Sequence, residues 1–127
     1  MPASFDYTVI RIVPRVERQE FINAGVVVFC LEKRYLAAHI LLDEQRLKAL
    51  WPDVDVDVVR GHLEAIPLIC AGDESAGPIA KLSQRERFHW LSSPRSTMIQ
   101  PSPVHTGICD EPSGVLERLT KQFLAEG

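Results

Sequence analysis

The sequence predicts an α+β fold, with a mainly antiparallel sheet of three to five strands and helices packed mostly on one face. Apolar, β-branched runs joined by short polar breaks come early in the chain, and stretches with the apolar spacing of helices follow them. Separation of strands from helices along a chain is typical of α+β folds. The 127 residues, 46% hydrophobic, contain no repeat or linker and fit one domain spanning 1–127.

Three early segments are predicted to be strands. Tyr7–Val13 is rich in β-branched residues and stops at Pro14, which cannot continue a sheet ladder. Gly25–Leu31 is continuously apolar, the pattern of a strand that is covered on both faces. Tyr35–Leu42 returns after a short polar break, so a hairpin is the simplest connection between these last two strands.

Helices are predicted over 44–51, 55–70 and 112–125. Asp43 and Asp55 stand where N-caps belong, and Pro112 suits a first helical turn. Alternating Asp and Val residues over 53–59 also look like a strand, but the apolar spacing of the longer window favours a helix. Pro67 is expected to kink or end that helix.

Shorter elements are expected between the second and last helices. Ser83 and Glu86 have the spacing of a capping box, which predicts a short helical turn towards Trp90. The segment 92–103 contains three prolines and excludes long regular structure, although short extended pieces around 97–100 and 104–106 could join the sheet.

Charge, hydropathy and cysteine usage narrow the class of protein. The net charge of −3 argues against a general nucleic-acid binder, although a local basic patch stays possible. The longest apolar run is far shorter than the roughly 20 residues that span a bilayer, and no secretory signal is visible. Three cysteines far apart in sequence, Cys30, Cys70 and Cys109, favour reduced thiols and therefore a cytoplasmic location.

No catalytic, metal or cofactor signature is present. The four histidines form no short pair of the kind that binds zinc, and no glycine-rich phosphate loop occurs. Asn23-Ala24-Gly25 resembles a tight turn into a strand, in which Gly25 is expected to supply a backbone conformation or a close approach. Cys109, expected in a polar loop, is the only plausible reactive thiol, but no activating group stands beside it. We therefore assign no catalytic residue, no metal and no cofactor, and the sequence leaves open whether the protein is an enzyme.

The first set of candidate binding residues surrounds the bend after the first strand. Its arginines can present guanidinium groups to a phosphate, a carboxylate or an acidic partner. Arg11 shares a half-buried strand face with Val9 and needs a partner, for which Glu20 is the candidate. An internal ion pair beside a solvated turn is the simpler alternative. The set is Arg11, Arg15, Arg18, Glu20 and Asn23.

The second set lies in the proline-stiffened late segment and comprises Arg95, Ser96 and His105. A guanidinium flanked by hydroxyls suits recognition of an oxyanion, and loops held by a scaffold often carry binding groups. Alternatively, the hydroxyls satisfy the backbone of their own loop. Nothing in the sequence fixes the geometry that a serine–histidine catalytic pair would require.

Four segments resemble a bacterial family of domains of unknown function, one with a serial number in the three thousands. They are Tyr7–Arg11, Arg18–Phe29, Arg87–Ser96 and Gln100–Gly107, and the resemblance extends over nearly the whole chain. It implies no established activity. It does imply a gene neighbourhood with a HipA-like serine/threonine kinase, and hence a possible kinase partner.

Three functional hypotheses remain. The first is a non-enzymatic protein-interaction or regulatory module, with a HipA-like kinase as candidate partner. The second is a small enzyme or binder that acts on a phosphate-containing small molecule or nucleic acid, with Glu20 or His105 as acid or base. It requires Arg15, Arg18 and Arg95 to meet in one cleft. The third is a purely structural domain.

Overall fold

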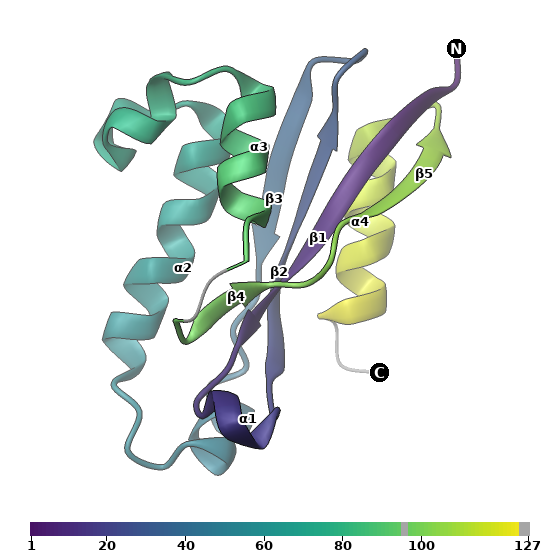
Figure 1. Cartoon of the computed structure of the whole chain (residues 1–127). Coiled ribbons are helices and arrows are strands. Elements are labelled where there is room, and N and C mark those ends of the chain that lie inside the picture. Colours follow the sequence, from purple (N-terminus) through teal and green to yellow (C-terminus); the bar gives the residue numbers. More distant parts are fainter. Residues whose placement is uncertain (95–96, 125–127) are drawn as a thin grey trace.

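A five-stranded antiparallel sheet forms the centre of the molecule (Figure 1). The computed structural model describes residues 1–94 and 97–124. The strands run in the order β3-β2-β1-β4, and β5 pairs with the other end of β1 on the same edge as β4. The strands are β1 (Ala3–Ile12), β2 (Ile22–Cys30), β3 (Tyr35–Ile40), β4 (Ile99–Pro101) and β5 (His105–Cys109). The predicted α+β class and antiparallel sheet are confirmed.

Helices cover both faces of this sheet. Three pack on one face, namely α1 (Glu44–Leu50), α2 (Val56–Ala71) and α3 (Gln84–Ser92), while α4 (Pro112–Phe123) lies alone on the opposite face (Figure 1). Short 3₁₀ helices occur at Val16–Arg18, Glu74–Ala76 and Pro78–Lys81. Among the residues described, no helix is both long enough and apolar enough to cross a membrane.

The helix starts follow the capping residues seen in the sequence. The side chain of Asp43 accepts a hydrogen bond from the backbone of Arg46, and Asp55 does the same for Val58. The caps decide the ambiguous Asp–Val alternation in favour of helix α2. Ser83 opens α3 in a complete capping box.

The position of β2 between two cores explains why its sequence is apolar without alternation. Val27 and Phe29 face the core under α1, α2 and α3, whereas Val26, Val28 and Cys30 face the core under α4. Both faces of this strand are therefore buried, and every residue from Ala24 to Cys30 is removed from water.

The segment Asn23–Gly25 is not the turn that its residues suggested. It lies inside β2, where the register against β1 shifts between Ile10 and Arg11. Ala24 is the extra residue of this β-bulge, and a glycine beside it can mark a bulge as well as a turn. At Gly25 an added Cβ would lie 2.6 Å from Cδ1 of Ile40 and 3.3 Å from Cβ of Ile10, which confirms the close approach expected there.

A buried arginine ties the end of α2 to the start of α3. Arg87 donates hydrogen bonds from Nη1 to the carbonyl oxygens of Ile69 (2.8 Å) and Cys70 (2.7 Å), and from Nε to Leu82 (3.0 Å). The negative end of the helix dipole compensates the buried charge. These bonds stabilise the last turn of α2, which continues past Pro67 to Ala71, so the proline does not end the helix.

We expect Arg87→Met to lower the free energy of unfolding by about 2 to 4 kcal/mol, because it leaves buried carbonyl oxygens unpaired while keeping the apolar stem. Urea unfolding followed by circular dichroism measures this change. Arg85→Met is the matched control, since Arg85 is exposed on the same helix. Equal stability of the two variants would contradict the role given to Arg87.

Candidate functional site

The two candidate segments meet in the sheet. Arg11 on β1 stands opposite Asn23 on β2 and opposite Gln100 on β4. The backbone amide of Val13 donates to the carbonyl oxygen of Met98 at 2.6 Å, which extends the contact past the end of the strand. The strand that leads into the arginine-bearing bend therefore pairs with the described part of the late segment.

Arg11 has an aromatic neighbour instead of the acidic one that was predicted. Its guanidinium carbon lies 4.2 Å from the ring centroid of Phe21, a cation–π contact. Its Nε is buried without a hydrogen-bond partner, as is Oδ1 of Asn23, whose Nδ2 donates to the carbonyl oxygen of Phe123 at 3.4 Å. Glu20 pairs with Arg18 at 2.5 Å, so the proposed ion pair between Glu20 and Arg11 is wrong.

The other predicted residues do not gather around Arg11. Arg15 is exposed on the bend. His105 is exposed on β5, with its ring 5.2 Å from that of Tyr7, which lies four residues before Arg11 along β1. Four residues of strand correspond to about 13 Å, so the imidazole and the guanidinium belong to different neighbourhoods. Arg95 and Ser96 lie outside the described residues.

Ser102, which the sequence did not single out, is a structural residue in the late segment. Only 3% exposed, it accepts a hydrogen bond at Oγ from the backbone amide of Val9 (2.8 Å) and donates one to the carbonyl oxygen of Pro103 (3.0 Å). Its own backbone amide donates to the carbonyl oxygen of Val9 (2.7 Å), and Thr8 donates to the carbonyl oxygen of Ser102 (2.8 Å). The hydroxyl of Ser102 therefore bonds both to its own loop, at Pro103, and to β1, at Val9.

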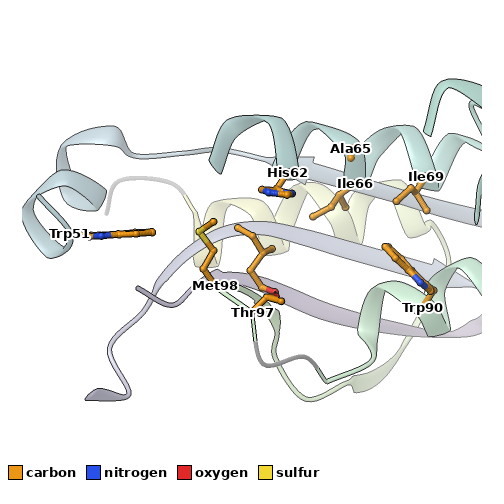
Figure 2. A pocket seen from close by; sticks show the side chains of 9 residues that line it. Trp51, His62, Ala65, Ile66, Ile69, Trp90, Thr97 and Met98 are labelled. Carbon is orange, nitrogen blue, oxygen red and sulfur yellow. The ribbon is translucent and has the colours of Figure 1, made fainter. Parts of the chain in front are cut away.

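An apolar groove between α2 and β4 has a volume of about 500 Å³. Figure 2 shows Trp51 and Trp90 at its two ends, with His62 and Met98 between them. The walls are otherwise Ala65, Ile66, Ile69, Thr97 and Ile99. None of the described residues that line this groove is an acid, a lysine or an arginine, so this lining suits an apolar group rather than an anion.

A second hollow of about 640 Å³ lies on the other side of Trp90, between α3 and the sheet. Phe29 and Phe88 form an apolar part of its wall, and their rings stack with centroids 5.3 Å apart. Charged and hydroxyl side chains complete the lining: Asp6, Arg85, Glu86, His89, Ser92 and Ser93. Leu82, Trp90 and Val104 also line it and are 38%, 38% and 45% exposed. We call the two hollows and the shared Trp90 the α3 surface.

Two of the three thiols, those of Cys70 and Cys109, have raised pKa values. Burial raises the pKa of Cys70 to about 12, although the nearby charge of Arg87 acts in the opposite direction. The pKa of Cys109 is also raised, first by desolvation and then by Cys30. Cys109 lies in β5 rather than in the polar loop expected from sequence. Within the described part of the chain, no group of three or more histidine, cysteine or acidic side chains is placed to hold a metal ion.

Comparison with known families matches residues 7–124 to a family described as a protein of unknown function, DUF3037. The chain belongs to this family. The match confirms the resemblance seen in the sequence, and the family's description assigns no activity. Comparisons with curated proteins and with solved structures give no match.

We expect alkylation of the native DUF3037 domain by iodoacetamide to occur mainly at Cys109, because Cys30 and Cys70 are buried. A raised pKa leaves less thiolate at neutral pH, so the rate should keep increasing as the pH rises past the usual thiol range. Mass spectrometry of quenched samples measures the rate at each cysteine. A fast reaction at neutral pH would show an activated thiol and contradict this expectation.

We expect Ser102→Ala to reduce the free energy of unfolding by about 1 to 3 kcal/mol, since the buried amide of Val9 loses its acceptor. Ser93→Ala is the control, because Ser93 bonds to His89 at the exposed end of α3 and its loss should change stability by about 0.5 kcal/mol or less. Thermal unfolding of both variants gives the comparison. Full stability of Ser102→Ala would mean that this serine has another role.

Proposed function

We propose that this domain is a non-enzymatic protein-interaction module that binds its partner on the α3 surface. The observation that supports the proposal is the pair of apolar hollows, about 500 and 640 Å³, that share Trp90. Apolar depressions with a polar rim are typical of protein interfaces, and tryptophan is enriched among the residues that contribute most to binding. A partner that inserts apolar side chains beside Trp90 fits this surface.

The rim of the α3 surface suits a partner of mixed charge. Arg85 and His89 offer hydrogen-bond donors from α3, whereas Asp6 and Glu86 offer acceptors. Groups of both signs at the edge of an apolar centre set the orientation of a partner more than its affinity. The resemblance to a family encoded beside HipA-like kinases makes such a kinase the first partner to test.

The phosphate hypothesis has less geometric support. It needs a free guanidinium at Arg18, and that group is paired with Glu20. The histidine that it would use lies near Tyr7, away from the bend that carries Arg15. Among the described residues, no lysine or arginine lines the apolar groove, which is the more enclosed of the two hollows.

We expect Val104→Glu to weaken capture of the partner about tenfold, because it places a charge at the wall of the second hollow. The experiment is co-purification with a HipA-like kinase from the same genome, followed by titration calorimetry. Leu41→Glu is the matched control, since both side chains are 45% exposed and Leu41 is not part of the α3 surface.

Two results would count against the proposal in different ways. Equal binding by wild type and Val104→Glu would place the interface elsewhere on the domain. Failure of the wild-type domain to bind the kinase, while it remains folded, would remove the kinase as partner.

A further inference from the structure

Strand β5 has an open outer edge. Among the described residues it pairs only with β1, from Ala3 opposite Cys109 to Tyr7 opposite His105. Natural proteins usually protect such an edge with charged residues or proline, because its backbone groups can pair with another strand. The five residues His105–Cys109 contain none of these, and Ile108 is 74% exposed.

The remaining strand edges are better protected. Helices α2 and α4 both pack against β3, one on each face, so that a strand approaching its edge meets helices above and below. Strand β4 is only three residues long and ends in Pro101, which has no amide hydrogen to donate. The main strand contacts of α4 are with β2 and β3, away from β5. These differences single out β5 as the edge that is open to pairing.

The sequence of β5 is compatible with pairing to itself. In an antiparallel pair centred on Gly107, the two glycines face each other, Thr106 faces Ile108, and His105 faces Cys109 of the second copy. No pair brings two acidic or two basic residues together, which removes the repulsion that would oppose this register. The central position has no side chain, and a Cβ there would lie 2.6 Å from Cζ of Phe5.

We propose that two copies of this chain associate through antiparallel pairing of their β5 strands, which joins the two sheets into one. The contact is isologous, so it closes at two copies. It places each Ile108 beside Thr106 of the other copy and reduces its exposure to water. A contact built on five residues buries less than the area of a stable interface, so we expect a reversible dimer that forms at micromolar or higher concentration. This inference is independent of the α3 surface.

Sedimentation velocity over a concentration series, from about 5 to 500 μM, tests the association. We expect the average mass of the wild type to rise from that of one chain towards that of two. Ile108→Lys should remain monomeric, because a lysine on an edge strand opposes pairing. Val58→Lys should dimerise like the wild type, since Val58 is 46% exposed on α2, away from β5.

A cross-link tests the register directly. In the proposed pair, residue 105 of one copy faces residue 109 of the other within the range of distances that a disulfide spans. Mild oxidation of His105→Cys should therefore give a covalent dimer, and the additional change Cys109→Ser should abolish it. A wild type that stays monomeric throughout the series would overturn the proposal. Dimers that persist in Ile108→Lys, without the cross-link, would overturn it as well.

Discussion

The hydrogen bonds between Ser102 and β1 hold together the half of the molecule that carries its candidate surfaces. At Val9 and Thr8 the central strand changes partner from β4 to β5, and the serine supplies both a hydroxyl and backbone groups at that junction. Without it, two adjacent short strands would each have to pair with β1 on their own. A short strand forms few hydrogen bonds with its neighbour, and these offset little of the conformational entropy that its backbone loses. The additional buried hydrogen bonds of Ser102 therefore decide whether β4 and β5 form.

A second polar anchor acts on the helical side. The charged side chain of Arg87 is buried, and it donates hydrogen bonds to carbonyl oxygens rather than to a carboxylate. Because those oxygens end α2, the arginine fixes how α2 and α3 lie relative to each other. Gly72 follows with a positive φ of 72°, and a Cβ there would lie 3.3 Å from Nη1 of Arg87, so the turn and the arginine depend on one another. Residues of α2 and Trp90 of α3 line the apolar groove, which therefore depends on this contact.

Features that depend on neighbouring residues were predictable from the sequence, and features that depend on distant ones were not. Asp55 and Ser83 marked helix starts because a cap needs only the next three residues. Asn23 and Gly25 suggested a turn because the same residue types serve turns and bulges, and only the pairing with β1 distinguishes them. The predicted ion pair of Arg11 with Glu20 was wrong for a similar reason. Proximity in sequence does not show on which side of the strand the following residues lie.

The apolar groove was even less predictable from the sequence, because its lining residues are far apart along the chain. Trp51 follows α1, Trp90 lies in α3 and Met98 precedes β4, and each alone looks like an ordinary core residue. No spacing rule connects them, so the groove appears only when α2, α3 and β4 are in place. Ser102 gave no signal either, because a buried hydroxyl and a solvated one have the same sequence pattern.

The position of β5 also has a consequence for how the chain reaches its folded state. Ala3 pairs with Cys109, so β1 cannot complete its second edge until residue 109 has been synthesised. Contacts between such distant positions carry a large loop-closure cost and slow folding. During synthesis β1 and β2 can form a hairpin early, while the other edge of β1 stays unpaired until β5 has been synthesised. This interval is when the nascent chain is most exposed to aggregation, and protection by a chaperone would matter most then.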